Sequence, residues 1–154
     1  MSLQTDIIFV AAITSDAELL QQLAIGDVYN TTIAMPDEDL DNAEVPYVIV
    51  SQGEVVNDGT TKDEYEGDTD SVNITIEVAA RTRAELGTLA DRIRKAVRRY
   101  FRASEEGDEL HDMVPLDYQF SFKPVTYDPL KPCWWMELNY QCDVKNDSTE
   151  EDDE

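Results

Sequence analysis

The chain has 154 residues, is 42% hydrophobic and carries a formal net charge of −22. A chain of this length buries roughly 68–70% of the surface that its unfolded form exposes, so it needs no disulfide or metal to fold. The strong negative charge excludes a general nucleic-acid binder, because carboxylates repel the phosphate backbone. No stretch reaches the ~18 apolar residues of a membrane span, and the N-terminus lacks the positive flank of a secretory signal, so we expect a protein kept in a cytoplasm, away from membranes.

The N-terminal segment from Leu3 to Ala24 is predicted to be helical, in two pieces. Ser15-Asp16-Ala17-Glu18 has the spacing of a capping box, in which the serine and the glutamate each satisfy a backbone N–H group. The second piece would end at Gly26. A buried strand over Ile7–Ile13 is an open alternative, because a short apolar run fits both structures.

Two short β-prone segments follow, Val28–Ile33 and Tyr47–Ser51, on either side of an acidic loop. The next stretch, Gln52–Asp70, carries seven acidic residues, one lysine and three glycines. Asn57-Asp58-Gly59 within it is a strong local turn signal. We expect either a long exposed hairpin arm or a mobile loop, since a loop of this length is usually functional or disordered.

Strict alternation of apolar and polar residues predicts three half-buried strands, over Ser71–Ala80, Pro115–Lys123 and Trp134–Val144. In the middle one, the side chains predicted to face inward are Leu116, Tyr118, Phe120 and Phe122. Tyr127–Pro132 is predicted to be a turn.

The two cysteines, Cys133 and Cys142, fall in the last predicted strand at a separation of nine residues. An odd separation places their side chains on opposite faces, so they should not form a disulfide with each other. Two free thiols fit a reducing compartment.

The element order α–β–β–β–α–β–β predicts an α+β fold. We expect a mainly antiparallel sheet of four to five strands, with two helices packed on one face and the other face polar. Residues 1–145 are expected to form a single domain. Residues 146–154 are an acidic C-terminal tail, which we expect to be flexible.

The helix after the third strand carries most of the positive charge: eight of the twelve Lys and Arg residues lie between Arg81 and Arg102. Thr82-Arg83-Ala84-Glu85 is a second capping box, and the helix should run to about Arg102. A helical wheel gathers its apolar residues into one core-facing stripe: Leu86, Leu89, Ala90, Ile93, Val97, Tyr100 and Phe101. The opposite side is cationic, with Arg92, Lys95, Arg99 and Arg102 at its centre and Arg94 and Arg98 beside them.

Three interpretations of this cationic side are open. It can be a solvated face whose charges pair with acidic loops of the same molecule, it can meet an acidic loop of a neighbouring subunit, or it can contact DNA through phosphates alone. The aromatic side chain of Trp135, predicted to lie on the polar face of the last strand, indicates either a contact surface or simple packing. The candidate interface residues are therefore Arg92, Lys95, Arg98, Arg99, Arg102 and Trp135, with Asp58, Asp63, Glu64 and Glu66 as their acidic counterparts.

No pattern of catalytic or metal-binding residues is present. The single histidine, His111, lies in an acidic loop and is interpreted as a surface residue. The acidic run Asp37–Asp41 superficially resembles a calcium loop. Asn42 stands where that loop needs its turn glycine, however, and Val48 stands where it needs its bidentate glutamate. We expect a protein that is not an enzyme, with no catalytic residues, no metal and no cofactor.

The order of features resembles the tail-terminator and tail-completion (head–tail joining) family of long-tailed bacteriophages, over Thr5 to Val144. The resembling segments are the N-terminal helix ending in Leu19-Leu20, Gly26-Asp27-Val28-Tyr29, Val45-Pro46-Tyr47-Val48-Ile49-Val50, Val72–Ala80, Ala84–Tyr100 and the final two strands. The acidic tail after Val144 is not a feature of that family.

The resemblance implies a virion structural protein in the neck or tail, assembled in the cytoplasm of a bacterial host. Proteins of this family form rings, often hexameric, that cap the tail tube. The implied partners are further copies of the chain, the tail-tube protein and a head-side connector protein, and DNA would pass through without specific binding. The alternatives are another neck adaptor, such as a head-completion protein, or an acidic DNA mimic that inhibits a DNA-binding protein.

Overall fold

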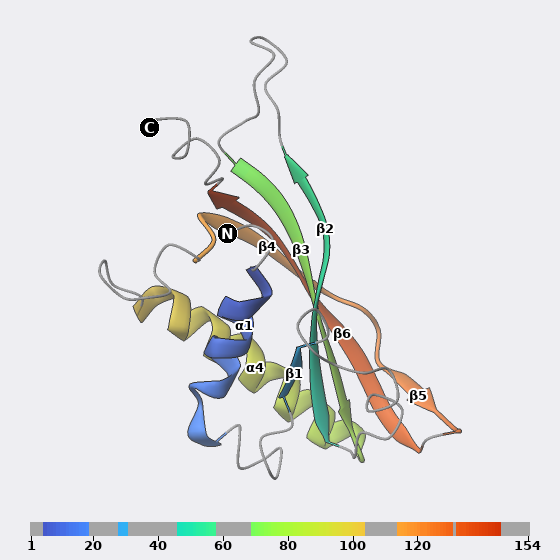
Figure 1. Cartoon of the computed structure of the whole chain (residues 1–154). Helices are drawn as coiled ribbons and strands as arrows, with labels where there is room; N and C mark the ends of the chain where they lie inside the picture. The colour runs from blue at the N-terminus through green and yellow to red at the C-terminus, as the bar shows by residue number, and fades with distance from the viewer. Residues whose placement is uncertain are drawn as a thin grey trace, which may run out of the picture.

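In the computed structural model, which describes residues 5–18, 28–30, 46–57, 69–103, 114–130 and 132–145, two helices lie on one face of a twisted sheet (Figure 1). The described helices are α1 (Thr5–Thr14) and α4 (Arg83–Ala103). The described strands are β1 (Val28–Asn30), β2 (Tyr47–Asn57), β3 (Thr69–Ala80), β4 (Asp117–Phe122), β5 (Thr126–Asp128) and β6 (Cys133–Lys145). The predicted α+β class, with a mainly antiparallel sheet and both helices on one side, is confirmed.

The sheet is ordered β1-β2-β3-β6-β4, and β5 also pairs with β6. All pairs are antiparallel except β1 with β2, which is parallel. β4 and β5 follow one another along the same edge of β6, and the Lys123 N–H donates to the Glu137 carbonyl between them (3.0 Å). The segment predicted to be a turn over Tyr127–Pro132 therefore begins as a strand, and turn residues follow only after Asp128.

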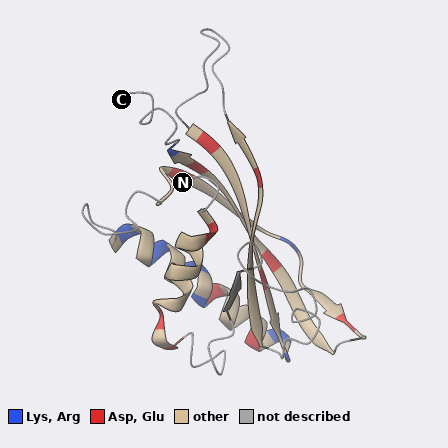
Figure 2. Cartoon of the chain, in the orientation of Figure 1, with Lys and Arg blue, Asp and Glu red and all other residues tan. Residues whose placement is uncertain are grey.

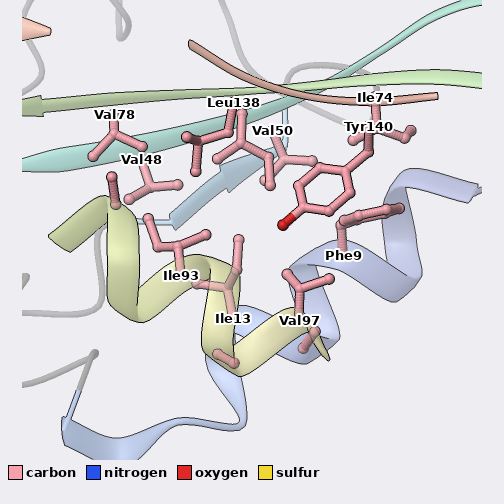
Figure 3. Close-up of a cluster of buried hydrophobic side chains, with 14 of the residues drawn as sticks. Phe9, Ile13, Val48, Val50, Ile74, Val78, Ile93, Val97, Leu138 and Tyr140 are labelled. Carbon is pink, nitrogen blue, oxygen red and sulfur yellow. The ribbon is translucent and has the colours of Figure 1, made fainter. Parts of the chain in front are cut away.

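The core lies between the sheet and the two helices (Figure 3). The inward residues of β3 and β6 meet the apolar stripe of α4, as the alternation and the helical wheel predicted. Rings from four elements pack together at one end of the core: Phe9 lies 5.3 Å from Phe101 and 5.0 Å from Tyr140, and Phe101 lies 5.9 Å from Tyr118, between centroids.

The alternative of a strand over Ile7–Ile13 is wrong, because these residues belong to helix α1. The helix is apolar on almost every side, and so the sequence shows no helical period there. Ile8, Phe9, Ala12 and Ile13 are fully buried. Its first turn is tied to the sheet by the Asp6 N–H, which donates to Gln52 Oε1 (3.0 Å).

Four side chains in and just before β4 were predicted to face inward. Two of them are exposed. Leu116 is 67% exposed and Phe122 63% exposed, whereas Tyr118 and Phe120 pack against the core. Helix α4 covers only the middle of this edge strand: Phe101 meets Tyr118, and the Arg94 guanidinium lies 4.1 Å from the Phe120 ring centroid. The alternating pattern thus predicted which side of β4 faces α4, but not how much of the strand the helix covers.

The other face of the sheet is not polar throughout. At one end of it, Tyr47, Ile49, Ala79 and Cys133 form a small buried cluster, against which Trp135 packs. Cys133 lies in this cluster and Cys142 in the main core, so both are free and buried on opposite faces, as predicted.

Strands β2 and β3 pair as far as Asn57 and Asp70, whose side chains are joined by an Nδ2–Oδ1 hydrogen bond of 2.7 Å. The two ends of the predicted arm therefore belong to a hairpin. Residues 58–68 lie outside the described part of the chain. So do the predicted second piece of the N-terminal helix after Glu18, the loop with His111, and the tail 146–154.

Leu89→Ala and Leu130→Ala make the same chemical change at opposite extremes of burial, because Leu89 is fully buried and Leu130 is 95% exposed. We expect Leu89→Ala to lower the free energy of unfolding by about 2–5 kcal/mol, through lost burial and the cavity left behind. Leu130→Ala should change it by less than about 0.5 kcal/mol. Urea unfolding measures both, and similar losses would contradict the described packing.

Alkaline pH should destabilise the fold. Burial raises the pKa of the Cys142 thiol to about 12 and raises the pKa of the Tyr140 hydroxyl above its ordinary value. Both groups keep their protons in the folded chain at a pH where the unfolded chain loses them, so stability is complete below the unfolded pKa and falls as pH rises past it. Each group lowers the free energy of unfolding by at most about 1.4 kcal/mol per pH unit.

Urea unfolding at a series of alkaline pH values measures this slope. Cys142→Val removes one of the titrating groups at similar volume, so the fall with pH should become shallower in that variant. An unchanged slope would show that the thiol does not stay protonated in the folded state.

Candidate partner-binding surface on helix α4

Helix α4 begins at the predicted capping box. Thr82 Oγ1 accepts a hydrogen bond from the Glu85 N–H (3.1 Å), and Glu85 Oε1 accepts one from the Arg81 N–H (3.3 Å). The reciprocal bond thus reaches one residue further back than in the standard motif, which uses the N–H of the capping residue itself. Leu86, Leu89 and Ile93 of the apolar stripe are fully buried, so the rotation of the helix is fixed and its cationic side faces outward.

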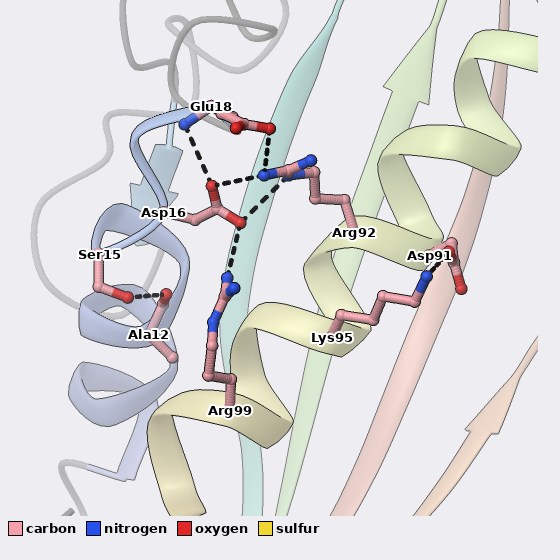
Figure 4. Close-up of polar contacts among 8 residues, drawn as sticks. All are labelled: Ala12, Ser15, Asp16, Glu18, Asp91, Arg92, Lys95 and Arg99. Carbon is pink, nitrogen blue, oxygen red and sulfur yellow. Dashed lines mark hydrogen bonds and ion pairs between the residues drawn. The ribbon is translucent and has the colours of Figure 1, made fainter. Parts of the chain in front are cut away.

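Two of the outward arginines are occupied within the molecule (Figure 4). Asp16, just after α1, has a side chain only 4% exposed. Its Oδ2 lies 3.2 Å from Arg92 Nε and 3.0 Å from Arg99 Nη2, and its Oδ1 lies 3.2 Å from Arg92 Nη2. Glu18 Oε2 adds a contact of 2.6 Å to Arg92 Nη2. We call the contacts of Asp16 with Arg92 and Arg99 the Asp16 clamp.

The Asp16 clamp favours the charged form of Arg92. The hydrogen bond to Asp16 is the main cause that raises the pKa of Arg92 above its ordinary value. The carboxylate also accepts the Glu18 N–H at Oδ1 (3.1 Å), so it is bonded both to the segment that follows α1 and to α4. Ser15 was predicted to be the capping residue, but its Oγ donates to the Ala12 carbonyl (2.7 Å) and Asp16 accepts the N–H bond instead. A carboxylate is the stronger acceptor, and here two guanidinium groups hold it in place.

The remaining cations of α4 differ in their surroundings. Lys95 pairs with Asp91 across one turn (3.0 Å), and Arg94 lies over the Phe120 ring. Within the described part of the chain, Arg98 and Arg102 have no ion-pair partner. Lys and Arg gather along this helix, as Figure 2 shows. An open hollow of about 490 Å³ on its outer side is lined by Lys95, Arg98, Arg99, Arg102 and Ala103.

The structure thus separates the predicted interface residues. Lys95, Arg98, Arg99 and Arg102 lie together around one hollow, whereas Arg92 is directed into the Asp16 clamp. Trp135 lies on the opposite face of the sheet and is half-buried against Ala79 and Cys133. The four acidic counterparts, Asp58, Asp63, Glu64 and Glu66, fall outside the described residues.

Sequence reasoning missed Asp16 as a partner of the basic helix. Asp16 is 76 residues from Arg92 and 83 from Arg99, and no local pattern indicates an ion pair at that separation. The only available signal was an acidic residue at the end of an apolar helix. A second missed contact is Arg83, whose guanidinium carbon lies 6.0 Å from the Trp134 ring centroid.

Among the described residues, no group of His, Cys, Asp and Glu side chains is placed to hold a metal ion. The described helices also include none that is both long enough and apolar enough to cross a membrane.

Comparison with known proteins shows the fold but not a family. No family model matches the chain, and no curated protein matches it in sequence. A solved structure described as "Virion of native gene transfer agent (GTA) particle" contains a chain with the same fold, at a TM-score of 0.57. The likeness covers 92% of this chain and 94% of that chain, at 14% sequence identity.

Asp16→Asn should destabilise the fold, because the amide keeps the shape of the side chain but loses its charge in the Asp16 clamp. Hydrogen bonds to charged groups contribute about 1.5–3 kcal/mol each, and partial exposure of both arginines reduces this, so we expect a loss of about 1–3 kcal/mol.

Asp91→Asn is the matched control, since Asp91 is 62% exposed and, among the described residues, forms an ion pair with Lys95 alone. Such a pair is worth about 0.5 kcal/mol or less. Thermal or urea unfolding of both variants measures the difference. Equal effects would mean that the clamp contributes no more than a surface ion pair.

Proposed function

We propose that the protein is a structural component of a phage-like virion, where it forms a ring at the head–tail junction. The observation that carries the proposal is the fold shared, over nearly the whole of both chains, with a chain of the gene transfer agent virion. The resemblance of residues 5–144 to the tail-terminator family supports the more specific position. In this role the chain is not an enzyme, and its partners are copies of itself, the tail-tube protein and a head-side connector.

The surface suited to subunit contact is the outer side of α4. Arg98 and Arg102 are exposed and lack a carboxylate partner among the described residues, in a chain of net charge −22. An acidic segment of the next subunit, with Asp58, Asp63, Glu64 and Glu66, would neutralise them and set the orientation of the two subunits. Each subunit then carries both halves of a head-to-tail contact, which closes into a ring.

The same surface distinguishes the proposal from the DNA-mimic alternative. A mimic presents carboxylates to a basic protein, whereas here the most distinctive exposed group is cationic. In a ring whose other surfaces are acidic, DNA would pass without being held, because carboxylates do not neutralise phosphates. A head-completion protein is the alternative within the same class, and the choice of partner in the following experiment tests it.

Sedimentation velocity of the purified protein, alone and with the tail-tube protein of the same particle, tests the assembly. We expect a closed oligomer under at least the second condition. A chain that stays monomeric in both contradicts the proposal, and an oligomer that forms only with a head-side connector favours the head-completion role.

Arg98→Glu combined with Arg102→Glu should weaken this association by at least about tenfold, a loss of roughly 1.4 kcal/mol. The fold should be unaffected, since neither side chain has an ion-pair partner within the described residues. Arg81→Glu combined with Arg83→Glu is the matched control, with the same charge change at the other end of the helix. Reversal of Arg92 and Arg99 is unsuitable as a test, because it would break the Asp16 clamp. Equal effects of the two double variants would show that net charge, and not this surface, drives assembly.

A further inference from the structure

The acidic C-terminal tail is a strongly charged segment to which the proposed function gives no role. It carries six carboxylates in nine residues: Asp147, Glu150, Glu151, Asp152, Asp153 and Glu154. A run of like charges usually keeps a segment solvated and repels other acidic chains. Such a run can also bind a cationic surface that lies within its reach.

The tail starts close to the cationic hollow of α4. β6 ends at Lys145, and Cys142 of β6 pairs with Tyr118 of β4. The Tyr118 ring lies 5.9 Å from that of Phe101, which immediately precedes Arg102. The C-terminal end of α4 and the end of β6 therefore lie at the same end of the molecule (Figure 1). Nine extended residues span about 30 Å, as much as a helix of about 20 residues, so the tail is long enough to follow the C-terminal half of α4.

The hollow offers charges of the opposite sign. Lys95, Arg98, Arg99 and Arg102 surround it, and Arg98 and Arg102 have no carboxylate partner within the described chain. Within the described residues Arg99 donates to Asp16 through Nη2, and a guanidinium group has five N–H donors, so Arg99 can take a further acceptor. Residues 95, 98, 99 and 102 follow the i, i+3, i+4, i+7 spacing of one helix face, so their cations lie in one row, which suits an extended run of carboxylates.

We propose that the tail of each chain docks on the cationic hollow of its own α4 before assembly. The short tether gives the tail a local concentration of the order of millimolar, so it binds ahead of a second copy at low protein concentration. A consequence, which rests on the proposed function, is that the tail competes with the acidic segment of the neighbouring subunit. It would keep free subunits apart until the surroundings of the growing particle displace it.

Nuclear magnetic resonance of the full chain and of a chain ending at Lys145 tests the docking. The Nε–Hε signals of Arg98 and Arg102 should differ between the two, whereas that of Arg83 should not. The difference should be independent of protein concentration, since the contact is within one chain. A difference that grows with concentration would overturn the proposal in favour of a contact between copies, and no difference would overturn it outright.

A labelled synthetic peptide of residues 146–154 provides the second measurement. It should bind the shortened chain at least about tenfold more tightly than the full chain at low salt, and this difference should vanish near 1 M salt, where charges are screened beyond about 3 Å. Equal binding to both chains would contradict the proposal. So would a shortened chain that binds duplex DNA but not the peptide, because the hollow would then be a phosphate site.

Two sets of four neutralising substitutions separate this proposal from the proposed function. One set is Glu150→Gln, Glu151→Gln, Asp152→Asn and Asp153→Asn in the tail. The other is Asp63→Asn, Glu64→Gln, Glu66→Gln and Asp68→Asn in the acidic arm, with the same change of charge. The tail set should abolish the Arg98 and Arg102 shifts and promote association. The arm set should leave the shifts and weaken association. Loss of the shifts in both sets, or in neither, contradicts tail docking whatever the protein's oligomeric state.

Discussion

The arrangement of the two helices depends on one buried carboxylate. Asp16 is 4% exposed, and an unpaired charge at such a site would cost several kcal/mol in lost hydration. That cost is compensated by the contacts with Arg92, Arg99 and the Glu18 N–H. The two arginine contacts require the end of α1 to lie against the middle of α4. Helix α1 itself offers little other directional information, because it is apolar on almost every side. The Asp16 clamp therefore fixes where α1 ends on α4, while the apolar stripe of α4 fixes which side of that helix meets the sheet.

The Asp16 clamp also determines which cations remain for other partners. On a helical wheel Arg92, Lys95, Arg99 and Arg102 form one uniform stripe. In the fold, Arg92 forms ion pairs with Asp16 and Glu18, and Lys95 forms one with Asp91. The guanidinium of Arg94 lies over the ring of Phe120. Arg92 and Arg99 thus pair within the molecule, but with Asp16 just after α1 and not with one of the acidic loops that the sequence had suggested. Arg98 and Arg102, toward the C-terminal end of the helix, have neither an ion-pair partner nor an aromatic partner in the described chain, and the proposed contacts use that end.

The difference between local and long-range contacts explains how far the sequence could predict the structure. Strands β3 and β6 and helix α4 were predicted nearly to their ends, because a period of 2 or 3.6 residues and a capping box are local signals. The cap at Asp16, the exposure of Leu116 and Phe122, and strand β5 depend on neighbours far along the chain. An alternating pattern shows that a side chain points inward, but not whether a helix lies above it. A helical wheel likewise shows that Arg92 points outward, but not that it forms an ion pair with an aspartate 76 residues away.

The proposed assembly brings together chains of net charge −22, but repulsion between whole subunits and pairing of single residues act over different distances. Repulsion between whole subunits acts at long range and is screened beyond roughly 8 Å at physiological ionic strength. A contact between an arginine and a carboxylate acts at about 3 Å, where little mobile salt intervenes. A small cationic surface on a strongly acidic body can therefore select one orientation of its neighbour, while every other approach is repelled. In the proposed assembly, the acidic surplus would contribute to specificity, because it would exclude contacts that compete with the one at α4.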